Sequence, residues 1–265
     1  RRHSGQKDSA SNLRRLLEGS GYTTKQGEIR MQDSYSLRCI PQIHGASRLA
    51  VDYVSSVIEN ELNAVTDNPV VFIETGEVYS GGNFHGEPVA IAADTLGIAV
   101  SELGNISERR IAKLIDPSLN HGLSAFLVKN GGINCGFMIP QYAAAALVSE
   151  NKILAHPASV DSIPTSAGQE DHVSMGTIGA RKAAAIVDNV TTVLGIELMS
   201  AAQAIDLQEK KKMGKGTSEA YKLGRSKRDV MENDRIFYKD QKLAADLIHE
   251  GTLVASVEKV IGEIN

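Results

Sequence analysis

The sequence predicts an all-α protein built as a bundle of long helices. Apolar residues recur in steps of three and four over most of the chain, which places them on one face of a helix. Two long stretches, 88–117 and 170–206, have no strong helix breaker in their interior. We find no internal repeat and no series of alternating strands. The fold class expected is therefore the long-helix type.

Composition supports a globular chain and excludes several classes of protein. The hydrophobic share is 42% and the charged share 23%, as in ordinary soluble domains. A formal net charge of −4 argues against a general nucleic-acid binder. The chain shows no apolar run of membrane-spanning length, no signal-peptide pattern and no CxxC pair among its two cysteines. We expect a cytoplasmic protein with no membrane and no nucleic-acid partner, forming one helical domain over 1–265.

The first third should hold two helices and a hairpin. Leucines within 13–17 form the end of an amphipathic helix. A second helix is expected over 43–65, and the turn-rich TDNPVVF ends it because Asn68 precedes a proline. Residues 70–84 combine β-branched residues with glycines, which predicts a short hairpin or loop.

The middle of the chain should hold the longest helices. Pro88 suits a first helical turn and Pro117 lies just past the last one. An alanine-rich helix is expected over 141–155. The helix over 170–206 would be a rod on the order of 50 Å at ~1.5 Å per residue. Rods of this length favour a bundle shared between subunits.

The last third changes character. Residues 206–240 are charged and contain glycines, with both signs mixed. This composition favours a solvated connector over a basic contact patch. A last helix is expected over 241–261.

Three polar stretches could carry chemistry. In MQDSYSLRC, Gln32, Tyr35 and Arg38 are spaced three apart, as on one helix face. A guanidinium binds a carboxylate through two parallel hydrogen bonds, so Arg38 could bind a small anion. The alternatives are an ordinary ion pair for Arg38 and a core position for Tyr35.

The other two stretches lie at expected helix starts. In SGGNFHGEPVA, His85 and Glu87 could be metal ligands, but no HExxH pattern and no second ligand cluster accompany them. We therefore predict no metal site, and a capping role for Glu87. In TSAGQEDHVSMG, Glu170 would need a cationic or hydrogen-bonding partner if it were buried, for which an imidazole would serve. The alternative is a capping acid in water.

Together, several stretches resemble the aromatic amino-acid ammonia-lyase family, and within it the members that act on histidine. The stretches, in order, are MQDSYSLRC, NAVTDNPVVF, SGGNFHGEPVAIAAD, SERRIAKLID, SENKILAHPASVDSIPTSAGQEDHVSMG and LGIELMSAAQAID. The resemblance covers residues 1 to about 206 and continues more loosely to the end. It implies elimination of ammonia from L-histidine to give trans-urocanate. It also implies an electrophile, 4-methylideneimidazol-5-one (MIO), made from an internal Ala-Ser-Gly, acting together with a general base.

The resemblance assigns roles to six residues. Arg38 matches the arginine that binds the substrate carboxylate, and Tyr35 and Gln32 match site residues near the electrophile and the reacting carbon. Glu170 matches the carboxylate that faces the imidazole, where relatives acting on phenylalanine or tyrosine typically carry glutamine. Phe84 and Met138 match residues that line the pocket.

The sequence departs from the family pattern at one point. It contains Ser-Ala-Gly and Gly-Ala-Ser but no Ala-Ser-Gly. We therefore expect the C-terminal part of such an enzyme, without MIO and inactive alone, from a family whose homotetramers build each site from three chains. The alternatives are a phenylalanine or tyrosine lyase or aminomutase, a fumarase–aspartase relative, and a non-enzymatic helical assembly module.

Overall fold

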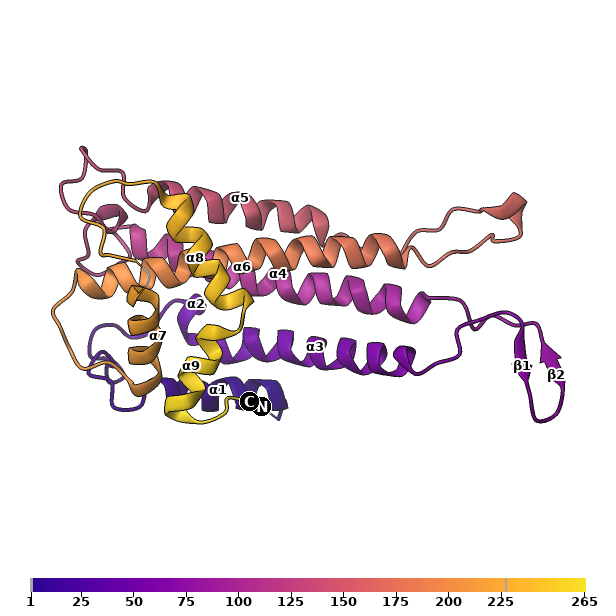
Figure 1. The fold of residues 1–265 in the computed structure, drawn as a ribbon. Coiled ribbons are helices and arrows are strands. Elements are labelled where there is room, and N and C mark those ends of the chain that lie inside the picture. The colour runs from indigo at the N-terminus through magenta and orange to yellow at the C-terminus, as the bar shows by residue number, and fades with distance from the viewer. Residues whose placement is uncertain (1, 227) are drawn as a thin grey trace.

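Four long helices run side by side along the molecule, as the all-α prediction requires (Figure 1). The computed structural model describes residues 2–226 and 228–265. The long helices are α3 (Ile40–Leu62), α4 (Glu87–Ile115), α5 (Met138–Leu154) and α6 (Gly176–Asp206). The shorter ones are α1 (Ser4–Leu16), α2 (Tyr35–Arg38), α7 (Lys215–Ser226), α8 (Phe237–His249) and α9 (Thr252–Ile261).

Helices α4 and α6 form the centre of the bundle and pack along each other. Helix α3 lies against α4, α1 lies against α3, and both α5 and α8 lie against α6. One group of fully buried apolar residues joins α4, α5 and α6: Ile111, Ala144, Val193 and Ile196. A larger group, which includes Leu127, Phe137, Met199 and Met231, fills the end where α4 finishes.

Both central helices contain an 18-residue stretch as apolar as a membrane span, which the sequence analysis did not anticipate. In the fold these stretches are 50% and 44% buried, and the two helices are each other's main packing partners. Their apolar character is accounted for by the bundle core, where a helix is apolar over a wider face than on a surface.

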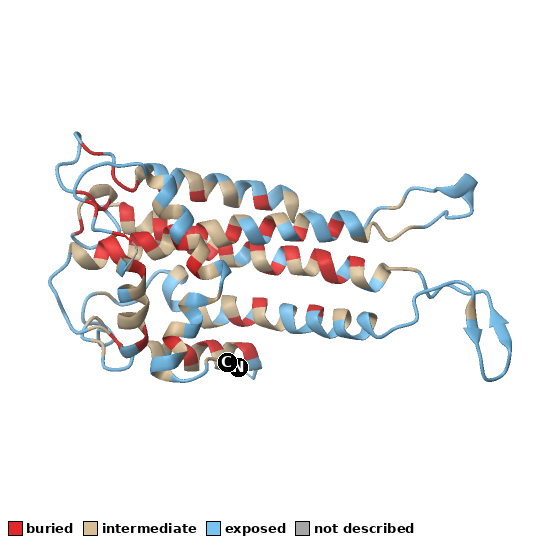
Figure 2. Cartoon of the chain, viewed as in Figure 1, coloured by how far each residue is buried: buried red, intermediate tan, exposed pale blue. Residues whose placement is uncertain are grey.

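A hairpin and a loop extend from the end where α4 and α6 begin, and both are mostly exposed (Figure 2). The hairpin pairs β1 (Val70–Phe72) with β2 (Glu77–Tyr79) in antiparallel register, which confirms the prediction for 70–84. The loop joins α5 to α6 and contains a short 3-10 turn, Ser166–Gly168.

The helix predicted from Glu170 begins later, at Gly176. Met175 adopts a left-handed conformation directly before Gly176, which a right-handed helix does not tolerate. The backbones of Thr165 and Glu170 pair with each other instead. The predicted last helix is likewise divided into α8 and α9, because Gly251 adopts a left-handed conformation.

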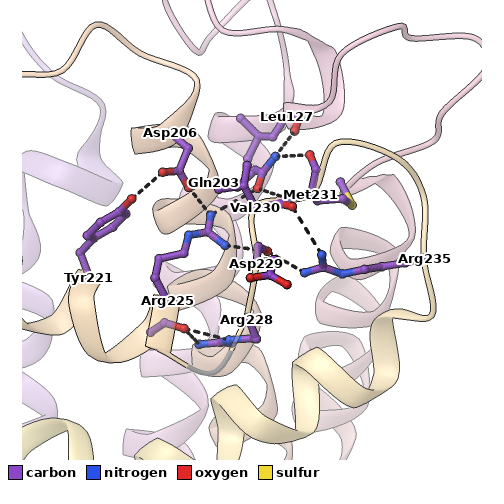
Figure 3. A network of polar contacts seen from close by, with 11 residues as sticks. Leu127, Gln203, Asp206, Tyr221, Arg225, Arg228, Asp229, Val230, Met231 and Arg235 are labelled. Atoms are coloured by element: carbon purple, nitrogen blue, oxygen red, sulfur yellow. Dashed lines mark hydrogen bonds and ion pairs between the residues drawn. The ribbon is translucent and has the colours of Figure 1, made fainter.

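The segment 206–240 is more structured than the predicted connector, since it contains α7 and the side chains of Arg228 and Met231 are buried. Figure 3 shows why. The fully buried amide of Gln203 donates to the carbonyls of Leu127 (3.1 Å) and Met231 (2.9 Å) and accepts from the Met231 N–H (3.1 Å). Buried polar groups require such partners, so these bonds fix the segment against α6.

Arg225 and Arg228 of this segment also bond to partners within the fold. Arg225 pairs with Asp206, which also accepts a hydrogen bond from the Tyr221 hydroxyl (2.5 Å) (Figure 3). Arg228 donates to the carbonyl of Gly224 at 3.1 Å. Charge composition predicted solvation for the whole segment, but Arg225 and Asp206 are paired within the fold, while Lys210, Lys211 and Lys212 are exposed as expected.

Helices α1 and α3 cross with their backbones in contact, because both have a glycine at the crossing. A Cβ atom on Gly45 would lie 2.5 Å from the amide nitrogen of Gln6, and one on Gly5 would lie 2.6 Å from the Gly45 carbonyl oxygen. Gly81, in contrast, has nothing within 4 Å of such an atom.

We therefore expect Gly45→Ala to lower the free energy of unfolding by about 1–3 kcal/mol, because α1 must move away from α3. The shift of the urea midpoint at constant slope measures this. Gly81→Ala is the matched control and should stay within about 0.5 kcal/mol of the parent. Equal effects of the two substitutions would contradict a tight crossing.

Candidate active site

A cavity of about 460 Å³ lies at the end of the bundle where the hairpin and the loop emerge. Its lining comes from two segments that are far apart in sequence, 84–86 and 169–174. Two of the six predicted site residues, Phe84 and Glu170, are therefore brought together here. Phe84 precedes the first turn of α4, and Glu170 precedes α6.

Local structure fixes the position of Glu170. Its backbone N–H and carbonyl both bond to Thr165, and its carboxylate accepts a hydrogen bond from the Thr165 hydroxyl at 2.6 Å. The residue remains exposed in the single chain. An exposed carboxylate on an ordered loop can accept a further hydrogen bond from a ligand N–H.

A buried carboxylate on α4 anchors the same loop. Asp94 is 7% exposed and accepts the backbone N–H groups of Ala158 (2.8 Å) and Ser159 (2.7 Å). Lys182 lies 3.9 Å from its other oxygen. Burial alone raises the pKa of Asp94, but the N–H groups of Ser159 and Ala158 and the Lys182 charge outweigh burial, so the pKa lies below its usual value.

We expect Asp94→Asn to cost about 1.5–3 kcal/mol of stability at neutral pH, the range for hydrogen bonds to charged groups. Because the folded-state pKa lies below the unfolded value of ~3.9, the stabilisation is fully present above that value. It is lost as the pH falls through the folded-state pKa. Denaturation curves at a series of pH values should therefore converge for parent and variant in acid. Asp188→Asn, on the exposed face of α6, is the control; curves that stay parallel in acid would contradict this role.

The second group of predicted residues lies elsewhere. Tyr35 and Arg38 form part of the four-residue helix α2, whereas Gln32 precedes it, so the three do not share one helix face. Tyr35 is 69% exposed, which contradicts a core position. The Arg38 guanidinium lies 4.6 Å from the centre of the Tyr35 ring. Within residues 2–226 and 228–265, no carboxylate pairs with Arg38, so the ion-pair alternative gains no support.

An ion pair on the long helices holds α2 in place. Arg110 of α4 pairs with Glu197 of α6, and Ser107 donates to the same carboxylate at 2.6 Å. A further Arg110 nitrogen reaches the Ser36 carbonyl at 3.5 Å. Nearby, burial first and then the Arg110 charge lower the pKa of His44, which favours a neutral imidazole.

Within one chain, the predicted residues on the α2 segment lie far from those that line the cavity. Phe84 lies just before Glu87 at the start of α4, while Arg110 contacts the α2 segment, and α4 rises roughly 35 Å between Glu87 and Arg110 at ~1.5 Å per residue. Met138 begins α5 and follows Phe137, which packs with Ile115 at the far end of α4. Of the six residues, only Phe84 and Glu170 line the cavity.

The sequence analysis missed a polar cluster beside this cavity. His172 Nδ1 lies 3.3 Å from His85 Nε2, and ligand atoms of His85, Glu87 and His172 all lie within 4.8 Å of one another. His85 and His172 are 87 positions apart. No local spacing rule connects residues at that separation, so only the fold could show the cluster.

Comparison with known proteins places this geometry in a family. The family model described as aromatic amino acid lyase matches residues 1–226. The chain belongs to the aromatic amino acid lyase family. Members of this family generally depend on MIO. The family assignment replaces the fumarase–aspartase alternative.

Several relatives within the aromatic amino acid lyase family carry the same name. Histidine ammonia-lyase 2 of Fusobacterium nucleatum is 66% identical over 99% of this chain and 52% of its own length. Histidine ammonia-lyase of Alkaliphilus oremlandii is 59% identical over 98% of this chain and 51% of its own length. The chain thus spans about half the length of the curated relatives it matches.

Solved structures of family members match the fold. Histidine ammonia-lyase from Trypanosoma cruzi has a TM-score of 0.89 at 47% identity, covering 98% of this chain and 48% of that one. Tyrosine aminomutase from Streptomyces globisporus has a TM-score of 0.93 at 34% identity, covering 100% of this chain and 54% of that one. The fold is common to both chemistries, so the choice between them depends on site residues.

Proposed function

We propose that this chain forms part of an ammonia-lyase that converts L-histidine to trans-urocanate. The observation that carries the proposal is Glu170, an exposed carboxylate held in a cavity beside Phe84. A carboxylate there can accept a hydrogen bond from an imidazole N–H or pair with an imidazolium. The names of the most similar relatives agree with this substrate.

In this proposal the α2 end of another copy faces the cavity. Arg38 binds the substrate carboxylate through its guanidinium fork, and its position over the Tyr35 ring limits its motion. Tyr35 and Gln32 lie near the reacting carbon, where Tyr35 serves proton transfer. Phe84 and Met138 form apolar walls.

A homo-oligomer is needed because Arg38 and Glu170 lie at opposite ends of the α4 rod. Large apolar side chains exposed along the long helices support such an assembly, and a tetramer is the form we propose. They include Tyr53, Ile91, Ile98, Tyr142, Ile153 and Ile178. Apolar surface of this extent on a monomer is typical of an interface. We place the enzyme in the cytoplasm, in agreement with two free cysteines.

The electrophile would have to come from outside this chain. The 265 residues contain no Ala-Ser-Gly, so they do not fit the precursor of MIO, and no step through MIO is derived from them. When present, MIO would supply an electrophile. The residues described above would bind and orient the substrate and move a proton.

The second candidate is a tyrosine or phenylalanine aminomutase or lyase. It is kept as a candidate because the tyrosine aminomutase structure shares this fold at 34% identity. Glu170 favours histidine, because an imidazole N–H can donate to its carboxylate, whereas a phenyl ring adds no donor to the Thr165 hydroxyl already bound there. A helical assembly module without activity is the remaining alternative.

The proposal is tested by adding amino acids to the longer protein that contains this chain and following urocanate formation by its absorbance. L-histidine should be converted, and L-phenylalanine and L-tyrosine should not. The 265-residue chain alone should give no urocanate. Conversion of tyrosine in preference to histidine would replace the proposal with the second candidate, and no turnover of any amino acid would favour the assembly module.

A further inference from the structure

The cluster beside the cavity has the composition of a metal site. His85 supplies Nε2, His172 supplies Nδ1, and Glu87 supplies a carboxylate oxygen, all within 4.8 Å of one another. Two imidazoles and one carboxylate are the protein ligands of many zinc sites. The three come from two segments on either side of the cavity, because Phe84 precedes His85 directly and Glu170 lies two residues before His172.

The spacing of the two nitrogens fits a shared metal ion. Nitrogens bound to Zn²⁺ at ~2.0–2.1 Å and at a tetrahedral angle lie roughly 3.3–3.4 Å apart. The observed separation of His85 Nε2 and His172 Nδ1 is 3.3 Å, and the ring centres are 5.3 Å apart. One histidine hydrogen-bonded to the other would show a similar distance, so a further observation is needed to choose.

Glu87 supplies that observation. Its Oε2 atom is shielded from solvent and accepts no hydrogen bond from the described residues. A carboxylate oxygen in that state carries an uncompensated desolvation cost, which an imidazole–imidazole hydrogen bond leaves in place. A divalent cation between the three side chains would compensate it. Glu87 also lies in the first turn of α4, at the helix end where backbone N–H groups point outward.

We propose that His85, Glu87 and His172 bind one divalent transition-metal ion of the zinc class. The bound ion joins the segment that carries Phe84 to the loop that carries Glu170. It is therefore a clip across the cavity, and it fixes the distance between the two cavity walls. This proposal stands apart from the lyase reaction, because its readout is metal binding.

Metal titration of the chelator-treated 265-residue chain tests the site. Calorimetry with Zn²⁺ should give one equivalent of tight binding, and Co²⁺ should give the visible absorption of a tetrahedral complex. Mg²⁺ should not compete, because it prefers oxygen ligands. His85→Gln and His172→Gln should each weaken Zn²⁺ binding by at least about a hundredfold, more than the loss of an outer-shell partner.

Two controls separate the site from chance binding. His249→Gln, on the distant helix α8, should bind Zn²⁺ as the parent does, and circular dichroism should show that all variants remain helical. Glu87→Gln should weaken binding while leaving the histidine pair intact. If the parent and the double variant His85→Gln/His172→Gln bound Zn²⁺ with equal affinity, the bound metal would be an adventitious ion only. That outcome would overturn the proposal.

Amide hydrogen exchange tests the clip itself. Zn²⁺ should slow exchange in peptides that cover 80–87 and 165–172 in the parent, and should leave both unchanged in His172→Gln. Slowed exchange in only one of these segments would overturn the cross-link between them.

Discussion

Glu170→Gln is expected to lower kcat/KM for L-histidine by roughly 10- to 100-fold in the enzyme that contains this chain. The substitution keeps the size of the side chain and its hydrogen bond with Thr165, but removes the charge. Hydrogen bonds to charged groups are worth about 1.5–3 kcal/mol, and each ~1.4 kcal/mol is tenfold in rate. Initial rates of urocanate formation over a range of histidine concentrations measure the loss.

The matched control for this experiment is Asp161→Asn. It removes the same charge from the same loop, and among the described residues the Asp161 carboxylate accepts a hydrogen bond only from the neighbouring Ser162 N–H. It should leave kcat/KM within about twofold, as for a surface position. Full activity of Glu170→Gln, or an equal loss in both variants, would show that the Glu170 charge does not recognise imidazole.

Arg38→Lys is expected to lower kcat/KM by roughly a hundredfold, mostly through a higher KM. Lysine keeps the charge but cannot form two parallel hydrogen bonds to a carboxylate, and it stacks less well on the Tyr35 ring. Arg14→Lys, an exposed position in α1, is the control. A variant with unchanged KM would exclude Arg38 from carboxylate binding.

The two variants together test where the site is built. If Arg38 and Glu170 of one site come from different copies, mixed oligomers of Arg38→Lys and Glu170→Gln chains contain some sites with both native residues. Co-expression should then recover a measurable fraction of activity above either variant alone. If both residues came from one chain, each mixed site would lack one of them and no recovery would occur. Two different affinity tags, one on each variant, and purification over both in sequence isolate the mixed oligomers.

The sequence predicted the fold well where apolar periodicity was long and uninterrupted. Helices α3, α4 and α5 and the β1–β2 hairpin lie close to their predicted positions. It failed where backbone conformation decided the outcome: Met175 and Gly251 adopt left-handed angles that set helix boundaries. It also failed over 206–240, since composition records charge but not the internal partners that pair with Arg225 and surround Arg228.

For the candidate site, local motifs identified the residue types but not their neighbours. The stretches around Arg38 and Glu170 are recognisable from their order and spacing alone. The length of α4 separates them, so that they lie at opposite ends of the helical bundle within one chain. Because of this separation, the proposed site depends on other copies of the chain.

The sequence by itself determined the all-α class, the family and the polar stretches, because helical periodicity and local motifs depend only on residues that are close together in the sequence. Only the tertiary structure placed His172 beside His85 and Glu87, and Phe84 beside Glu170. Such pairs are joined by the packing of α4 against α6, which brings together residues that no short-range pattern relates.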